Sequence, residues 1–355
     1  MTLPPSHVSC DKGISGLGTT HSKITMYSTC PQSKDVPRAE YAARVAEIAR
    51  WSDEAGCRGM LVYTDNSIAD PWMVAQHVIA NTISLRPLVA VQPVYMHPYT
   101  AAKIVASIAL LHGRAVDLNL VAGGFRNDLR ALSDEMPHDE RYDRVVEYAT
   151  IVQKLLDGEA PVTFEGRFYR VANLRLKPEL PPELRPGLLI SGSSPAGRDA
   201  ARAIDAIGIR YPQPPDQEDG LDLANNLRHG IRVGIIARED AADAWAVARA
   251  RFPSSRQGEI THALAMKVTD SEWHKQLAGT PDGGEDALDP YWLEPFKSYG
   301  TFCPYLVGNY ERVAQEVGRY LALGVQTIIT DIPRELDDLH HARRVVHDAQ
   351  TALAA

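Results

Sequence analysis

The sequence predicts an α/β fold, a (β/α)8 TIM barrel with insertions. Short apolar runs alternate with amphipathic segments along nearly all of the 355 residues, which is the pattern of repeated strand-helix units. The alternative is an open doubly wound sheet, but TMYSTCPQS, at the first apolar run, lacks the glycine fingerprint of that fold. The alternation breaks once, in a long interval after the seventh helix. We therefore expect one barrel domain.

The first four units end their strands at polar or glycine residues. Asp70 followed by Pro71 marks a helix start, because an aspartate accepts N–H bonds there and proline has no N–H to satisfy. Gly56 is a natural helix stop. We expect strands at 23–30, 59–63, 88–91 and 116–121, and helices at 38–55, from 71 onward, at 99–111 and at 140–156.

The last four units follow a small surface hairpin expected at 162–171, where two alternating runs flank Glu165 and Gly166. In the fifth unit Ser194 caps a helix whose first residue is Pro195. We expect strands at 187–190, 206–211, 231–237 and 325–330, and helices from 195 onward and at 218–228, 241–251 and 335–354.

Residues 253–306 interrupt the repeat and include the polar, glycine-rich run 279–289. Such an insertion is commonly a lid, and a disordered decoration is the alternative. Five aromatic residues would give the lid apolar cover, although they fit a dimer contact or local packing as well. These are Trp273, Tyr291, Trp292, Phe296 and Tyr299. Residues 1–22 are expected to be a flexible extension, which leaves 23–355 as the barrel domain.

Composition excludes several classes of protein. The net charge of −8, with no cluster of Lys and Arg, argues against a nucleic-acid surface. The four cysteines lie far apart without metal-ligand spacing, so we expect reduced thiols and no metal site. No segment has the length of a membrane span or the pattern of a signal peptide. We expect a cytoplasmic protein whose partners are small molecules or proteins.

The stretch 116–142 is the expected centre of a cofactor site. An apolar strand ends at Ala122-Gly123-Gly124, and a helix then opens at HDERY. His138 and Tyr142 are four residues apart, so both can face one group, and an imidazole with a phenol suits a phosphate oxygen.

A second element converges on the same anion. Ser193 and Ser194 lie at a helix start, where free N–H groups and the helix dipole favour negative charge. Simpler explanations exist: His138 as an exposed residue at the helix start, Tyr142 as packing, and Ser194 as a cap only. Asn119 and Ala122 lie where a flat ring would rest, or where a barrel needs small inward residues.

The chain resembles the bacterial luciferase-like flavin monooxygenases, in the branch of the alkanesulfonate, nitrilotriacetate and long-chain alkane enzymes. The resemblance covers about 24–346. It rests on DPWMVAQ at 70–76, NLVAGG at 119–124, HDERYDR at 138–144, GSSPAG at 192–197, and the closing VGNYERVAQEV and LGVQTIITDIP. HDERY and GSS together, at this spacing on a barrel, are fairly specific.

The resemblance implies an FMN-dependent monooxygenase, a homodimer that receives reduced FMN from a separate flavin reductase. Oxygen would react with the flavin to give a C4a-peroxide that oxygenates the substrate. The FMN contacts implied by position are Asp65, His138, Tyr142 and Ser194, with Ser193 as a companion. Gln92, at the end of the third strand, is a further candidate contact to the flavin ring.

Departures from the alkanesulfonate enzymes concern the substrate. Their cysteine after the second strand is Ile68 here, their histidine after the seventh-strand arginine is Gly234, and their last tyrosine before proline is Ile332. Losing three polar groups makes a small sulfonate doubtful. The seventh-strand arginine of those enzymes is present here as Arg232. It would either contact a carboxylate or phosphate of the substrate or form an ion pair at the end of the barrel.

Three function classes stay open from the sequence. The first is an FMN-dependent monooxygenase acting on a small organic molecule, with the catalytic residues unassigned because the cofactor carries the oxygen chemistry. The second is hydride transfer with the deazaflavin F420, which relatives on the same barrel use. The third is a non-catalytic flavin-binding protein.

Overall fold

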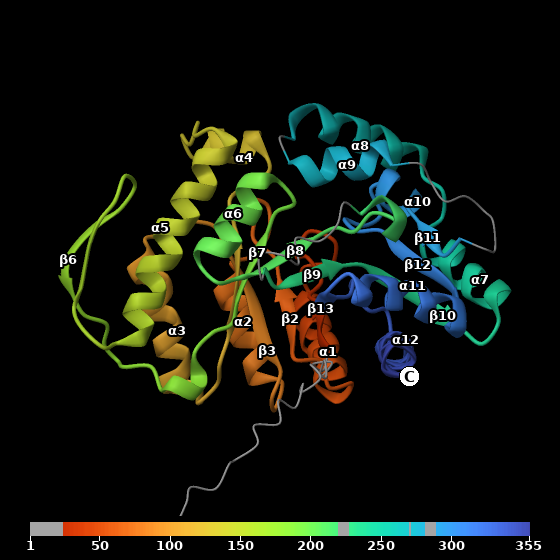
Figure 1. The fold of residues 1–355 in the computed structure, drawn as a ribbon, viewed down its shortest axis with the longest axis horizontal. Coiled ribbons are helices and arrows are strands. Elements are labelled where there is room, and N and C mark those ends of the chain that lie inside the picture. Colours follow the sequence, from red (N-terminus) through yellow and green to blue (C-terminus); the bar gives the residue numbers. More distant parts are fainter. Residues whose placement is uncertain (1–23, 219–226, 270, 281–288) are drawn as a thin grey trace, which may run out of the picture.

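Eight parallel strands close into a barrel surrounded by helices, which confirms the predicted (β/α)8 fold (Figure 1). The computed structural model describes residues 24–218, 227–269, 271–280 and 289–355. The barrel order is β1-β13-β9-β8-β7-β4-β3-β2. The strands are β1 (Thr25–Thr29), β2 (Gly59–Val62), β3 (Arg86–Val91), β4 (Asp117–Val121), β7 (Leu188–Ser191), β8 (Ile207–Arg210), β9 (His229–Arg232) and β13 (Val325–Ile329).

Side chains from six strands fill the inside of the barrel as one buried cluster, so the barrel has a packed core, as expected of this architecture. Its members are Tyr27, Leu61, Leu88, Leu189, Ile209 and Ile329. Larger clusters lie between the strands and the outer helices, where apolar strand faces meet apolar helix faces. The short apolar runs of the sequence are therefore buried on both sides.

The helices of the barrel follow their strands with the predicted caps. Asp70 Oδ1 accepts N–H bonds from Trp72 and Met73 at 3.0 Å, so α2 begins at Pro71 as predicted. The helices are α1 (Tyr41–Glu54), α2 (Pro71–Ala80), α3 (Pro98–His112), α5 (His138–Asp157), α6 (Pro195–Ala203), α11 (Tyr310–Ala322) and α12 (Leu336–Ala354). The loop predicted after β4 contains one short extra helix, α4 (Arg126–Ala131).

The predicted surface hairpin is confirmed: β5 (Val162–Glu165) pairs antiparallel with β6 (Arg170–Leu174), far from the centre of the barrel (Figure 1). Two single turns of 3-10 helix, Pro182–Leu184 and Pro215–Gln217, lie in loops. None of the helices in the described part of the chain is both long enough and apolar enough to cross a membrane.

The predicted seventh strand, 231–237, is wrong as a single barrel strand. The barrel strand β9 ends at Arg232, and β10 (Gly234–Arg238) belongs to a separate sheet, where it pairs in parallel with β12 (Tyr305–Asn309). Gly234 allows this exit, because a Cβ there would collide with the ring of Tyr305. The residues 231–237 form one nearly continuous apolar run, so the sequence pattern does not show that β9 ends and β10 begins within it.

The seventh barrel helix also differs from the prediction. α7 (Ala241–Arg251) packs on β10 and β12 of the separate sheet, whereas α11 packs against α12 and β13 of the barrel as well as against that sheet. The separate sheet is completed by β11 (Tyr291–Trp292), antiparallel to β12. The insertion therefore begins at the end of β9 and not after α7.

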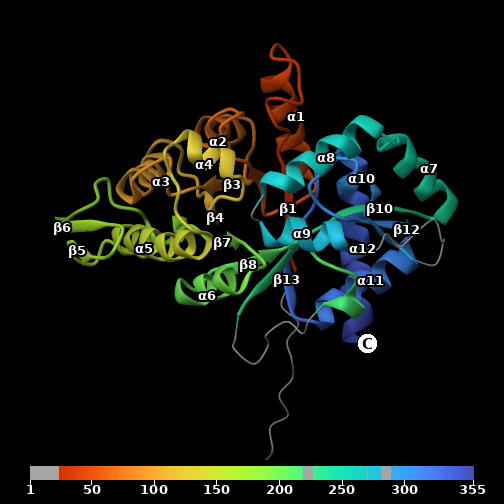
Figure 2. The ribbon, with the colours of Figure 1, turned by 90° about the horizontal axis from the view of Figure 1, so that it is seen from above.

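The expected insertion 253–306 contains α8 (Arg256–Val268), α9 (Glu272–Gly279) and α10 (Glu294–Lys297). Seen from above, α9 lies over the end of the barrel (Figure 2). The Thr269 hydroxyl donates to the Gly124 carbonyl at 3.2 Å, which ties the insertion to the end of β4. The expected extension 1–22, most of the helix 218–228 and most of the run 279–289 lie outside the described residues.

A polar network closes the opposite, N-terminal end of the barrel. The fully buried Asp117 carboxylate accepts hydrogen bonds from the Tyr27 hydroxyl at 2.7 Å, Arg58 Nε at 2.9 Å and the Gly187 N–H at 2.8 Å. Arg86 adds an ion pair at 3.5 Å. A buried carboxylate satisfied in this way stabilises the fold.

Candidate active site

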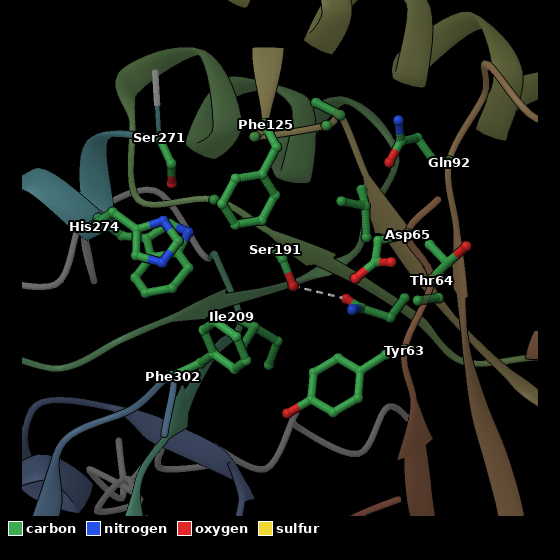
Figure 3. A pocket seen from close by; sticks show the side chains of 18 of the residues that line it. Tyr63, Thr64, Asp65, Gln92, Phe125, Ser191, Ile209, Ser271, His274 and Phe302 are labelled. Atoms are coloured by element: carbon green, nitrogen blue, oxygen red, sulfur yellow. Dashed lines mark hydrogen bonds between the residues drawn. The ribbon is translucent and has the colours of Figure 1, made fainter. Parts of the chain in front are cut away.

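A cavity opens at the carboxyl ends of the barrel strands, under the insertion (Figure 3). Every residue that the sequence singled out for the cofactor, together with Arg232, lies on its wall. These are Asp65, Gln92, Asn119, Ala122, His138, Tyr142, Ser193, Ser194 and Arg232. They come from the ends of five barrel strands or the helices that follow them, so the barrel gathers residues that lie up to 167 positions apart in the sequence, from Asp65 to Arg232.

The start of α6 forms one corner of the cavity. The Ser194 hydroxyl accepts the Gly197 N–H at 3.1 Å, so the predicted cap is confirmed. The neighbouring Ser193 hydroxyl is buried, and none of the described residues hydrogen-bonds to it. A buried hydroxyl without a partner costs free energy unless a ligand or water satisfies it. Ser193 therefore supplies a donor at the positive end of a helix.

The phenol of Tyr142 closes the same corner. Its hydroxyl lies 3.3 Å from the Ser191 carbonyl oxygen, and the residue is 7% exposed. Gly192 makes room for it, because a Cβ at Gly192 would collide with the Tyr142 hydroxyl. The GSS motif at 192–194 therefore packs against the tyrosine of the HxxxY motif at 138–142, although Gly192 and Tyr142 are 50 residues apart in the sequence.

His138 lies one helical turn before Tyr142, and the centroids of the two rings are 5.2 Å apart in an edge-to-face arrangement. Its Nδ1 is 2.7 Å from the Asp139 carboxylate, which leaves the other ring nitrogen for a group in the cavity. An imidazole, a phenol and a serine hydroxyl thus surround one corner, as the spacing predicted.

Small and amide side chains form the part of the wall next to this corner. Asn119 Oδ1 accepts the Ser191 hydroxyl at 3.0 Å, drawn as a dashed line in Figure 3. Gln92 is 7% exposed and lies against Gly123, whose φ of +93° and crowded Cβ position favour glycine. Together with the buried Ala122, these residues give this part of the wall two amide groups and small side chains.

Asp65 lies at the rim and is held by its own loop. Its Oδ1 accepts from both the N–H and the hydroxyl of Ser67 at 2.6 Å, and Lys34 is 3.8 Å from its Oδ2. Asp128 lines the same side, and burial together with the nearby Asp65 charge raises its pKa. This side of the rim is acidic.

Arg232 is buried in a cage of protein groups. It donates to the hydroxyls of Tyr63 and Tyr211, and its guanidinium lies 3.6 Å from the Asp331 carboxylate. These contacts agree with the ion-pair interpretation of Arg232. Asp331 also accepts the Tyr305 hydroxyl at 2.8 Å, so the tyrosine that excludes a side chain at 234 helps to hold this pair.

The insertion and four other loops supply a second half of the wall, most of which the sequence did not predict. Trp273 was expected to give cover, and it stacks on Tyr211 with centroids 3.7 Å apart. Tyr63 and Tyr211 follow barrel strands directly, which was an available signal. The remaining members of this half are Gln32, Phe125, Ser271, Glu272, His274 and Phe302.

Most of the aromatic residues proposed as lid cover pack elsewhere. Tyr291 and Phe296 are almost fully buried in the cluster around α11, and Trp292 packs edge-on against Trp245 at 5.5 Å. Tyr299 meets Phe302 at 5.6 Å. Among the five, Trp273 is the one on the described cavity wall, so local packing explains the others.

A model of the family described as luciferase-like monooxygenase matches residues 23–327. The chain belongs to this family. The luciferase-like monooxygenases are oxidoreductases that use a flavin or F420, so this protein is an enzyme with a small-molecule substrate.

One relative of this luciferase-like monooxygenase is 33% identical over 314 residues, which cover 87% of this chain and 92% of the relative. It is the 4-(γ-L-glutamylamino)butanoyl-[BtrI acyl-carrier protein] monooxygenase BtrO of Niallia circulans. Two solved structures share the fold. EDTA monooxygenase (EmoA) from Chelativorans sp. BNC1 matches with a TM-score of 0.71 and 14% identity, over 94% of this chain and 95% of that one. An F420-dependent secondary alcohol dehydrogenase matches with a TM-score of 0.64 and 14% identity, over 92% and 99%.

Proposed function

We propose that this enzyme is a reduced-FMN-dependent monooxygenase that oxygenates a small organic molecule. The observation that carries the proposal is the corner made by Ser193, Tyr142 and His138 at the start of α6. It offers a phosphate the helix dipole, a buried hydroxyl that needs a partner, and two further polar groups. The surface beside the corner, with Asn119 and Gln92, suits the flat, polar-edged ring of a flavin.

Each residue has a part in holding the cofactor. Ser193 and the N–H groups at the start of α6 would bind the phosphate, while Tyr142 and His138 would fix it from the side of α5. Gln92 and Asn119 would contact the ring edge. When bound, reduced FMN supplies the two electrons with which molecular oxygen is activated. The protein positions the substrate against the ring and keeps water out.

The insertion serves the exclusion of water in this proposal. Trp273 and His274 of α9 close the cavity on the side away from α6, and the Thr269–Gly124 hydrogen bond holds this cover against β4. We propose that α8 and α9 act as a lid over the site. BtrO, the relative named above, is a monooxygenase by name, which supports the proposed reaction class.

Binding of FMN is tested by titrating oxidised and reduced FMN into the protein without oxygen. Tyr142→Phe is expected to weaken binding by about 1–2 kcal/mol, because a hydrogen bond to a charged phosphate is lost. Tyr148→Phe is the matched control: Tyr148 is on the same helix, and its buried hydroxyl does not line the cavity. Wild-type affinity in Tyr142→Phe would place the phosphate elsewhere.

Admission of oxygen then separates the three function classes. An oxygenase forms product from a substrate when a separate flavin reductase and NADH supply reduced FMN. A protein that ignores FMN but binds F420 transfers hydride. One that binds FMN without coupling its oxidation to any substrate is a flavin-binding protein only.

We also propose a homodimer. Two successive helices carry exposed apolar side chains: Met73, near the start of α2, is 61% exposed, and Leu110 and Leu111, near the end of α3, are 69% and 73% exposed. Exposed apolar groups of this size favour association. Light scattering on the purified protein measures the mass, and Leu110→Lys with Leu111→Lys is expected to give monomers.

A further inference from the structure

The half of the cavity under the insertion has its own chemistry, distinct from the flavin half. Figure 3 shows Phe125, Phe302, Tyr63 and His274 around one hollow, with His274 and Phe302 across from Gln92 and Asp65. Rings therefore dominate the wall where a substrate would meet the cofactor. Aromatic walls favour flat ligands that pack against ring faces and edges.

The buried charge in this half is balanced. Arg232 is 2% exposed and is neutralised by Asp331 at 3.6 Å, with both terminal nitrogens engaged by tyrosine hydroxyls. Glu272 lines the cavity but is exposed to solvent. An anionic group bound among these rings would lose its hydration, and Arg232, the buried cation on the described part of the wall, is already paired with Asp331, so the cavity discriminates against such a group.

His274 offers a polar atom to a ligand in this half of the cavity, as Gln32 does with its Oε1. His274 is 3% exposed, and its Nδ1 is buried without a hydrogen-bond partner among the described residues. The ring stacks on Trp273 at 3.5 Å and faces Phe125 at 5.7 Å, which fixes its orientation. Burial keeps the imidazole neutral, because it lowers the His274 pKa to about 3. A neutral imidazole nitrogen forms one directional hydrogen bond with an uncharged polar group.

We propose that this half of the cavity is the substrate subsite and takes an uncharged aromatic ring whose hydroxyl or amide group hydrogen-bonds to His274 Nδ1. The proposal rests on the proposed function, since it places the substrate beside the flavin half. His274 is a positioning residue in this arrangement: it sets which ring carbon faces the cofactor. Carboxylates and sulfonates are rejected because Arg232, the buried cation among the described residues of the subsite, is already paired with Asp331.

Three fluorinated probes test the proposal by ligand-observed 19F NMR on the full chain with oxidised FMN in excess. They are 4-fluorophenol, 4-fluorotoluene and 4-fluorobenzoate. We expect 4-fluorophenol to bind at least about tenfold more tightly than 4-fluorobenzoate. Replacing His274 by Phe is expected to reduce the preference for 4-fluorophenol over 4-fluorotoluene by about three- to tenfold, the effect of one neutral hydrogen bond.

His262→Phe is the matched control. His262 is also a buried insertion histidine, with its ring 4.9 Å from Phe296, but it does not line the cavity. Its replacement should leave all three affinities unchanged. His274→Asn should restore the preference for the phenol, because the amide places a polar atom close to the position of Nδ1. If the Phe variant does not fold, His274→Leu compared with His274→Asn provides the same contrast.

The proposal is overturned if 4-fluorobenzoate binds as tightly as 4-fluorophenol, or if His274→Phe keeps the preference for the phenol. Failure of the proposed function has a different signature, since the protein then binds no FMN in the titration without oxygen. FMN binding with the wrong probe preference rejects the subsite alone.

Discussion

The two ends of the barrel treat buried polar groups in opposite ways. At the N-terminal end, Asp117 is fully buried and each of its oxygens accepts hydrogen bonds from the protein. At the C-terminal end, polar atoms are buried with no partner among the described residues: Gln32 Oε1, Ser193 Oγ, Arg232 Nε and His274 Nδ1. All four residues line the cavity.

This difference separates what stabilises the fold from what binds. An unsatisfied buried polar group costs about 1–3 kcal/mol, so four of them around one cavity are expensive for the empty protein. A ligand that satisfies them recovers that free energy on binding. The N-terminal end, already satisfied, can contribute only to stability.

The largest expected effect is at the N-terminal end. Asp117→Ala is expected to lower the free energy of unfolding by about 3 kcal/mol, because it leaves Arg58 and Arg86 without their buried partner. Urea denaturation measures the loss. The affinity of the folded fraction for FMN should stay within about twofold of wild type. A large loss of FMN affinity without loss of stability would contradict the assignment of the N-terminal end of the barrel to stability alone.

At the C-terminal end, the neutral His274 makes stability depend on pH. In the folded protein the pKa of His274 is about 3, below its ordinary value of 6.5. As the pH falls, this histidine is therefore protonated first in the unfolded chain. Stability is lost below about pH 6.5, by about 2 kcal/mol at pH 5. Urea denaturation at pH 7.5 and pH 5.0 should show that His274→Phe removes about this much of the loss. Equal losses in both proteins would contradict it.

Gly192→Ala should disrupt the phosphate corner without harming the barrel. The new Cβ would displace the Tyr142 hydroxyl, so FMN affinity is expected to fall about tenfold or more, measured by the anaerobic titration. Adding Tyr142→Phe relieves the closest contact. The FMN affinity of the double variant should therefore lie within a few-fold of that of Tyr142→Phe alone. A double variant that binds FMN much more weakly would contradict this explanation.

The smallest effects separate two adjacent serines. Ser194→Ala removes the cap of α6 and should lower the free energy of unfolding by about 1 kcal/mol. Ser193→Ala removes a hydroxyl that has no partner among the described residues, so it should not lower the free energy of unfolding, while FMN binds several-fold more weakly. Thermal and urea denaturation give the stabilities. A destabilised Ser193→Ala would mean that its hydroxyl serves the fold.

The sequence predicted the barrel and the residues that line the α6 side of the cavity because both depend on local patterns. Asp70-Pro71 and Ser194-Pro195 are cap signatures with a physical cause, and both begin helices where expected. Strand ends of a parallel barrel share one rim, so residues that follow them meet there regardless of distance along the chain.

The features that the sequence did not predict have a common physical reason. Each of them depends on contacts between segments that are distant in the sequence. Nothing in the apolar run 231–237 shows that Tyr305 fills the space beside Gly234 and diverts the chain from the barrel. Likewise, His274 belongs to the cavity because α9 rests on the end of β4 through Thr269 and Gly124. Side-chain periodicity carries no information about such docking.

The parallel pairing of β10 with β12 has a further consequence. Five consecutive residues of each strand are in register, from Gly234 with Tyr305 to Arg238 with Asn309, so the insertion is clamped at its base by backbone hydrogen bonds. The segment between these strands therefore leaves and re-enters the fold at one place. We expect that exchanging this segment for that of a relative changes substrate preference and leaves the α6 side of the cavity unchanged.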